Sequence, residues 1–350
     1  MIFSWVLRKK LKNKTIEIPS GLRKCSYVLI ILPQNRLEMV FQLENLIALL
    51  SLYKHAEITL LCTPGVSSFV RGLHGVRIQE YPPEEMCLYS LQWKTFIQES
   101  EGVFDLCINL EKQENLALLY LIGHCRIPIR VGYEEAGDYP FLNIRLKNSS
   151  QENRNLSERN RVISKFLGAK GNKNIEWGVS KTTADETKQL LREMKLAETS
   201  FLTGVDLCSL EAYCGKGWCE HLIRSLKKNT NGQFYIFSGM KGETNAIPSS
   251  ETFPLLPQLS IPQTAALIKQ THLIITSKSA LLGLAQLSSC HVAAVLKEKD
   301  FSIYCKNSPS VEPFTFTEKP SGETSDRIIQ HLKNLNSQTE KKKVMSHQKR

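Results

Sequence analysis

Several features that would classify this sequence at once are missing. Its ten cysteines include no Cys-x-x-Cys pair, and the crowded set Cys208, Cys214, Cys219 and His221 has no zinc-ligand spacing. We therefore expect free thiols in a reducing compartment and no bound metal. No repeat of solenoid length occurs. Residues 1–7 are apolar but too short to span a bilayer, and basic residues follow them, the reverse of a signal peptide. These absences favour a cytoplasmic protein.

The charges are also unbalanced, since 45 Lys and Arg against 34 Asp and Glu give a net charge of +11. Much of the excess lies near the two ends, in residues 8–14 and 341–350. Beside Trp5, Val6 and Leu7, the first cluster suits anionic lipid headgroups, and the alternative is a solvated terminus. There is no nucleic-acid motif and no interleaving of aromatic and basic residues, so we expect no nucleic-acid partner.

What the sequence does contain is a series of short apolar strands alternating with helical patterns. Four such strands cover residues 26–32, 56–62, 233–239 and 272–276. Continuously apolar strands are typical of parallel sheets covered by helices on both faces. Such sheets bind ligands beyond the carboxyl ends of their strands. The loops after Leu32, Gly239 and Thr276 are therefore the candidate functional loops.

The length of 350 residues predicts about two domains. A change of polarity near residues 176–182 marks the expected boundary. We predict an N-terminal Rossmann-like domain over 1–178, a C-terminal Rossmann-like domain over 179–337 and a basic, disordered tail over 338–350. The pattern also predicts a terminal helix over 325–335, which we expect to pack back toward the first domain.

Five blocks of the chain form a recognisable series. They are the opening strand and loop at 28–40, Phe-Asp-Leu-Cys-Ile-Asn-Leu at 104–110, Arg-Val-Gly at 130–132, Trp218, and the segment 256–268. In order and spacing they resemble glycosyltransferase family 9, the ADP-heptose:lipopolysaccharide heptosyltransferases, over residues 26–300. The resemblance implies an α/β, GT-B-like architecture: two Rossmann-like domains whose parallel sheets face a central cleft, with the acceptor on the first and the nucleotide-sugar on the second.

The resemblance implies an inverting sugar transfer without a metal or other cofactor. The acceptor hydroxyl must lose its proton as it attacks the anomeric carbon, so a carboxylate is required as general base. The position that matches the family's catalytic aspartate is Glu38. Glutamate keeps the functional group and lengthens the side chain by one methylene. Without the resemblance, Glu38 is interpreted as a first-turn carboxylate favoured by the helix dipole.

For the donor, the resemblance predicts a set of nucleotide-sugar-binding residues. They are Glu243 for the ribose hydroxyls, Leu259 for the base, and Lys278, Ser279 and Ala280 for the diphosphate. The last three are expected at a helix N-terminus, which binds anions. The alternative for them is an exposed loop lysine and an ordinary helix cap.

The donor side also departs from the family pattern. Asp206, Leu207 and Glu211 stand where the family has hydroxyls and a lysine, and two carboxylates facing a diphosphate would repel it. In the later signature Ser279 is kept, while the family's acid is replaced by Lys278 and its glycine and histidine are lost. We interpret this as a positive charge moved from one side of the cleft to the other.

Two functional classes remain open. The first is a heptosyltransferase-like enzyme that moves a sugar from a nucleotide-diphosphate donor, ADP-heptose in the family, to a lipid-linked or lipopolysaccharide-core acceptor. It would act in the cytoplasm, in contact with the inner-membrane surface through residues 1–14. The second is a catalytically inactive GT-B scaffold that serves as a binding or assembly protein. The sequence favours the first, because Glu38 and Glu243 keep the carboxylates that the family uses.

Overall fold

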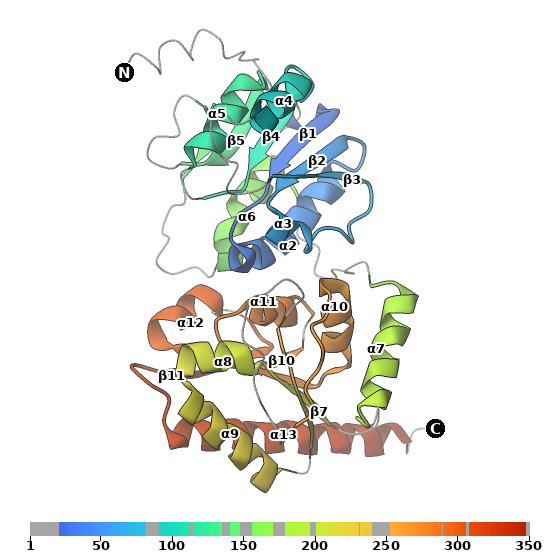
Figure 1. Cartoon of the computed structure of the whole chain (residues 1–350), viewed down its shortest axis with the longest axis vertical. Coiled ribbons are helices and arrows are strands. Elements are labelled where there is room, and N and C mark those ends of the chain that lie inside the picture. The colour runs from blue at the N-terminus through green and yellow to red at the C-terminus, as the bar shows by residue number, and fades with distance from the viewer. Residues whose placement is uncertain are drawn as a thin grey trace. The chain divides into compact units, whose positions relative to one another are not determined.

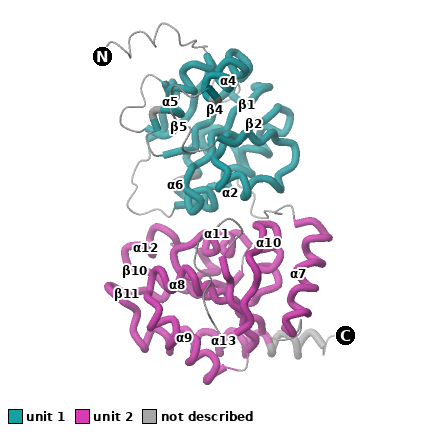
Figure 2. Tube along the Cα trace, viewed as in Figure 1, with its two compact units in different colours: residues 1–175 teal, residues 176–350 magenta. Residues whose placement is uncertain are grey.

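The computed structural model divides the chain into two compact units, residues 1–175 and 176–350 (Figure 2). Each unit is built on its own parallel sheet, with six strands in the first and five in the second. The prediction of two Rossmann-like domains is therefore confirmed. The structure describes residues 21–81, 91–112, 115–134, 141–147, 156–170, 179–196, 201–230, 232–239, 253–288, 290–305 and 308–347. The boundary expected at 178/179 falls beside a gap in these ranges.

Unit 1 alternates strands and helices in chain order (Figure 1). Its elements are the 3-10 helix η1 (Gly21–Lys24), β1 (Tyr27–Ile31), α2 (Arg36–Leu52), β2 (Glu57–Cys62), α3 (Pro64–Ser67), β3 (Val76–Glu80), α4 (Leu91–Ser100), β4 (Leu106–Asn109), α5 (Leu116–His124), β5 (Ile129–Tyr133), β6 (Ile144–Leu146) and α6 (Leu156–Leu167). The strand order is β3-β2-β1-β4-β5-β6, and every neighbouring pair is parallel. The order reverses between β1 and β4. In such sheets the crevice outside that reversal is the usual ligand site.

Helices cover both faces of the first sheet. On one face, Leu29 and Ile31 of β1 pack in a buried cluster with Trp93 of α4 and Leu118 of α5. Successive side chains of a strand point to opposite faces, so the intervening Ile30, which is fully buried, lies on the other one. On that other side are α2 and α6, which contact each other (Figure 1). Burial on both faces explains why β1 is continuously apolar.

Unit 2 repeats the pattern. Its elements are α7 (Lys181–Glu193), β7 (Leu202–Val205), α8 (Leu207–Cys214), α9 (Lys216–Asn229), β8 (Gln233–Ile236), α10 (Ile261–Gln270), β9 (Leu273–Thr276), α11 (Ala280–Leu287), β10 (His291–Lys297), α12 (Glu298–Tyr304), β11 (Val311–Phe316) and α13 (Gly322–His347). The strand order is β11-β10-β9-β7-β8, again all parallel. Here the order reverses between β7 and β9. The carboxyl ends of these two strands are therefore the expected ligand site of unit 2.

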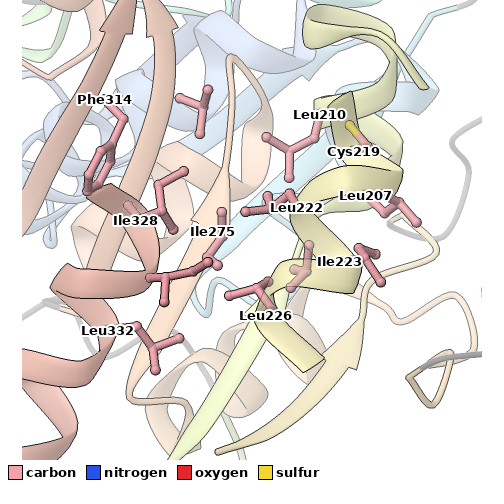
Figure 3. Close-up of a cluster of buried hydrophobic side chains, with 14 of the residues drawn as sticks. Leu207, Leu210, Cys219, Leu222, Ile223, Leu226, Ile275, Phe314, Ile328 and Leu332 are labelled. Carbon is pink, nitrogen blue, oxygen red and sulfur yellow. The ribbon is translucent and has the colours of Figure 1, made fainter. Parts of the chain in front are cut away.

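The core of unit 2 lies where α8, α9 and α13 cover one face of the sheet. Figure 3 shows its labelled side chains, which are Leu207, Leu210, Cys219, Leu222, Ile223, Leu226, Ile275, Phe314, Ile328 and Leu332. Figure 1 shows α9 and α13 side by side, and α13 also contacts β11. The prediction that the terminal helix packs toward the first domain is therefore wrong. Its apolar residues Ile328 and Leu332 complete the core of its own unit.

The terminal helix is also longer than the sequence predicted. It continues through His347, so the expectation of a disordered tail from residue 338 is wrong for 338–347. After Gly322 the helix contains neither Gly nor Pro, and residues 340–343 are Glu and Lys, which are good helix formers. Predicting a tail there gave too much weight to charge and too little to helix propensity.

The nine cysteines in the described ranges are free. Burial raises the pKa of the Cys62, Cys290 and Cys305 thiols to about 12, so these groups stay protonated and unreactive at neutral pH. Within the same ranges, no three His, Cys, Asp or Glu side chains are grouped closely enough to hold a metal ion. Nor does that part of the chain contain a helix of the length and apolarity needed to cross a membrane.

Candidate functional site

The loop between β1 and α2 places Glu38 beside the strand reversal of unit 1. Asn35 has an extended backbone (φ −77°, ψ 123°) and is the N-cap of α2. Its side-chain oxygen accepts hydrogen bonds from the N–H groups of Leu37 (2.9 Å) and Glu38 (3.2 Å). Two N–H groups of the first turn are thereby satisfied, and the helix begins at Arg36. The cap therefore fixes Glu38 in the first turn, as the sequence predicted.

A second carboxylate lies on the neighbouring strand end. Glu111 follows β4, is only 5% exposed, and accepts a 2.8 Å hydrogen bond from the N–H of Gln34 in the β1–α2 loop. Its own N–H donates to the side chain of Asn109 (3.2 Å). Leu110, which lies between Asn109 and Glu111, donates its N–H to the carbonyl of Ile31 at 2.9 Å. The loops after β1 and β4 are therefore joined at the position where the strand order reverses.

Five polar side chains form the cluster around Glu38, which we call the carboxylate cluster: Glu38, Gln42, Glu111, Lys112 and Tyr133. Burial and the negative charge of Glu111 raise the pKa of Glu38 above its ordinary 4.5, while Lys112 opposes this shift. The Lys112 Nζ lies 5.3 Å from the centre of the Tyr133 ring. Gln42, one turn after Glu38, donates to the Tyr133 hydroxyl at 3.5 Å. Burial, and to a smaller extent the Glu38 charge, raise the pKa of Tyr133.

This arrangement suits proton abstraction. A general base works best when its pKa approaches the operating pH, and a half-buried carboxylate beside another carboxylate moves in that direction. Glu111 is more deeply buried and holds Gln34, so Glu38 is the carboxylate of the pair that is available to an incoming group. The chemistry of the carboxylate cluster is therefore that of a base with a nearby cation, Lys112.

The sequence predicted Glu38 but missed Glu111, Lys112 and Tyr133. The signal for Glu111 was present, because it directly follows the apolar run 104–110. Only the strand order, which sets β4 beside β1, shows that this loop lies next to the loop after Leu32. A polar residue after any strand is otherwise unremarkable.

In unit 2, a network of oxygen atoms joins the ends of β7 and β9. Asp206 follows β7 and is 5% exposed. Its Oδ2 accepts hydrogen bonds from the hydroxyls of Thr276 (2.7 Å) and Ser279 (2.8 Å). Its Oδ1 accepts a longer bond from the N–H of Ser209 (3.4 Å) and caps α8. These bonds join the loop after β7 to the loop after β9.

This network describes the surroundings of Asp206, Leu207 and Glu211, the residues that the sequence set at the donor side. Asp206 is buried and accepts three hydrogen bonds, and Leu207 belongs to the core. Glu211 lies within α8, one turn after the capping residues. The sequence placed Asp206 correctly beyond a strand end but did not reveal its bond to Thr276, because a hydroxyl donor 70 residues away is invisible in the sequence.

The predicted diphosphate residues lie together at the start of α11. Ser279 is its N-cap, with an Oγ that accepts from the N–H of Leu282 (3.4 Å). Ala280 begins the helix and is buried, whereas Lys278 is exposed, with its Nζ 5.2 Å from the centre of the Tyr304 ring. The Ser279 hydroxyl is committed to the cap and to Asp206. Groups at this loop that suit an anion include the Lys278 ammonium and the first N–H groups of the helix other than that of Leu282.

A second lysine at the same edge was not predicted. Lys297 ends β10, the neighbour of β9, and its Nζ lies 5.8 Å from the centre of the Tyr213 ring. The Tyr213 hydroxyl accepts from the Lys297 N–H (3.1 Å) and donates to Asp300 of α12. Neighbouring strand ends thus carry Lys278 and Lys297, each over an aromatic ring. These two lysines supply positive charge at the carboxyl edge of the sheet.

Two further predicted residues bear on the donor. Leu259 is buried (5% exposed) and directly precedes Ser260, the N-cap of α10. Its place in the fold is therefore a loop that leads into a helix. Glu243, predicted for the ribose hydroxyls, lies outside the described residues, as does Lys241.

The chain is similar to known proteins in its structure. No protein-family model and no curated protein sequence matches the chain. Two parallel sheets of this topology, matched as one chain to solved glycosyltransferases, define the GT-B fold. Within that class, the fold of this chain is that of glycosyltransferase family 9.

Three solved structures carry this assignment of fold. A family 9 glycosyltransferase from Veillonella parvula aligns with a TM-score of 0.70 and 13% identity over 89% of this chain and 97% of its own. The ADP-heptose lipopolysaccharide heptosyltransferase II of E. coli aligns with a TM-score of 0.67 and 16% identity, over 90% and 99%. E. coli heptosyltransferase WaaC with ADP aligns at 0.65 and 12%, over 88% and 99%. The resemblance read from the sequence blocks is confirmed for the fold.

Proposed function

We propose that this protein is a glycosyltransferase that transfers a sugar from a nucleotide-diphosphate donor, with Glu38 as the general base. The observation that carries the proposal is the position of Glu38 at the strand reversal of unit 1, with burial and Glu111 raising the pKa of its carboxyl. The fold shared with family 9 supports the reaction class, and the match between Glu38 and the family's base position supports the role.

The reaction follows from these groups. The Glu38 carboxylate takes the proton of an acceptor hydroxyl as its oxygen attacks the anomeric carbon from the face opposite the leaving group. The bond between the anomeric carbon and the phosphate oxygen breaks, and the nucleoside diphosphate leaves with the electron pair. Lys278, Lys297 and the first N–H groups of α11 are the cationic and polar groups that would stabilise that developing charge. The configuration at the anomeric carbon is inverted.

The donor and acceptor are proposed by analogy. Solved relatives in fold include heptosyltransferase WaaC with ADP and with ADP-2-deoxy-2-fluoro heptose, and an ADP-heptose lipopolysaccharide heptosyltransferase. ADP-heptose and a lipopolysaccharide-core or lipid-linked acceptor are therefore the first substrates to test. We place the reaction in the cytoplasm, against the inner-membrane surface, where the basic residues within 1–14 would meet anionic lipid.

The alternative is an inactive GT-B scaffold used for binding or assembly. One observation favours it: the Ser279 hydroxyl and the Asp206 carboxylate, both near the expected donor site, are occupied by each other. A scaffold of this kind would bind no nucleotide-sugar, or would bind it without turnover.

Substitution of Glu38 tests the proposal. Glu38→Gln removes the basic oxygen and keeps the shape, so we expect transfer from ADP-heptose to fall by about 10²–10⁴-fold while donor binding is retained. The matched control is Glu44→Gln on the same helix, whose carboxylate pairs with Arg161 of α6. Full activity of Glu38→Gln would remove Glu38 from the mechanism. If the intact protein binds no nucleoside diphosphate or nucleotide-sugar at millimolar concentration, the glycosyltransferase proposal fails and the scaffold remains.

A further inference from the structure

The buried carboxylate of Glu111 takes no part in the proton transfer proposed above, yet it belongs to the carboxylate cluster. We infer that Glu111 is a positioning residue: through its hydrogen bond to the Gln34 N–H it holds the β1–α2 loop so that α2 presents Glu38 at the end of the sheet. The inference rests on the proposed function for the role of Glu38.

The path from Glu111 to Glu38 is short and continuous. The Oε2 of Glu111 accepts from the Gln34 N–H at 2.8 Å. The next residue, Asn35, caps α2 through its side chain, and its carbonyl accepts from the N–H of Met39 at 2.9 Å. Glu38 receives its backbone position from that cap. A displacement of Gln34 would therefore be passed to Glu38 through one intervening residue.

A carboxylate suits this task better than a neutral acceptor. Hydrogen bonds to an ionised oxygen are shorter and about twice as strong as neutral ones. Within the loop 32–35 (Leu-Pro-Gln-Asn), the N–H of Gln34 is the backbone group that binds Glu111. Glu111 is itself fixed, because its N–H binds Asn109 at the end of β4. The loop is thus tied to the neighbouring strand of the sheet.

The charge of Glu111 has a second, separable effect on Glu38. Two charged side chains from other elements act on Glu38: Glu111 and Lys112, which both follow β4. Glu38 in turn raises the pKa of Tyr133 in β5. Two helices also contact α2. Arg161 of α6 pairs with Glu44, and α3 (64–67) carries no charged side chain. Removal of the Glu111 charge should therefore lower the pKa of Glu38.

Two variants separate the hydrogen bond from the charge. Glu111→Gln loses the charge and keeps an oxygen within reach of Gln34. Glu111→Asp keeps the charge and shortens the side chain by a methylene, so the bond to Gln34 is lost. The control is Glu80→Gln, which removes a carboxylate that ends another strand of the same sheet and pairs with the exposed Arg71.

Two measurements compare these variants, and both are made without a donor or an acceptor. Nuclear magnetic resonance of protein with ¹³C-labelled glutamate carboxyls follows the titration of Glu38, assigned by its absence in Glu38→Gln. Amide hydrogen exchange follows the N–H groups of Gln34, Leu37 and Glu38. In Glu111→Asp we expect these amides to exchange about tenfold faster or more, with the pKa of Glu38 still raised. In Glu111→Gln we expect the amides to stay protected while the pKa of Glu38 falls.

The result that would overturn the inference is specific. If Glu111→Asp leaves the exchange of all three amides at the level of the intact protein and of Glu80→Gln, Glu111 does not position the loop. If neither variant changes the Glu38 titration or these amides, Glu111 has no effect on Glu38 at all. Neither measurement needs a donor or an acceptor, so a failure here is distinct from an absence of glycosyl transfer.

Discussion

Asp206 and Ser279, 73 residues apart in the chain, are joined by a 2.8 Å hydrogen bond from the Ser279 hydroxyl to the Asp206 carboxylate. Thr276 donates to the same oxygen at 2.7 Å. These bonds hold together the ends of β7 and β9, where the strand order of unit 2 reverses. Asp206, Thr276 and Ser279 therefore fix the loops at the carboxyl edge of the sheet. The charges left for an anion come from Lys278 and Lys297, which lie over aromatic rings at the same edge.

Arg130 should be one of the most sensitive positions of unit 1. It is 1% exposed, and its guanidinium donates to the carbonyls of Phe141 (2.6 Å) and Ile127. Arg130→Met keeps most of the volume but leaves those carbonyls without their donors, which should lower the free energy of unfolding by about 2–4 kcal/mol. Urea denaturation measures this loss. The exposed Arg77→Met on β3 is the control, and an equal effect of the two would show that the buried bonds contribute nothing.

His331 should make unit 2 less stable in mild acid. Burial lowers the pKa of His331 below its ordinary 6.5, and nearby His291 adds to this effect while Glu312 opposes it. The unfolded chain then binds the proton more readily than the folded one. Stability is therefore lost as the pH falls through about 6.5.

Melting temperatures measured between pH of about 7.5 and about 5.5 test this pH dependence. His331→Leu, which keeps an apolar contact with Phe314, should lose less stability over that interval than the intact protein. Replacement of the exposed His221 is the control. Parallel curves for the intact protein and His331→Leu would contradict the assignment.

The sequence predicted the architecture well because the information is local. Runs such as 28–31 are apolar at every position, which specifies a strand buried on both faces. Short segments carry too little pattern to be predicted: β6 has three residues, α8 has eight and α12 has seven. Strand β11 contains Pro313. Proline is found in strands mainly at the edge of a sheet, and β11 is an edge strand.

The candidate site was predictable only where one residue carried the signal. Glu38 could be found because it follows the first strand at a family position. Glu111 and Lys297 could not, because their importance depends on which strands are neighbours. That order follows from the packing of whole strands and helices, and no local pattern around either residue records it.

The basic N-terminal residues predict binding to anionic membranes. Residues 8–14 contain four Lys and one Arg next to Trp5, Val6 and Leu7. Near an anionic surface each basic side chain contributes about 1 kcal/mol, and salt screens that attraction. We expect the intact protein to sediment with phosphatidylserine-containing liposomes at low salt, and deletion of residues 1–14 to abolish this. Equal sedimentation of both proteins would remove the N-terminal residues from membrane binding.

Substitution of Lys278 tests whether the edge of unit 2 binds a diphosphate. It is exposed beside the N-terminus of α11, where a phosphate would meet both its ammonium and the first N–H groups of the helix. Lys278→Ala should weaken ADP binding, measured by calorimetry, by about 1–3 kcal/mol, the usual scale for a charged hydrogen bond. Lys269→Ala, in the last turn of α10, is the control. If Lys297 contacts the same phosphates, the double variant with Lys297→Ala will lose less than the sum of the two single losses. If ADP binds Lys278→Ala as tightly as the intact protein, the diphosphate does not use this helix end, and the proposal that Lys278 supplies its positive charge is wrong.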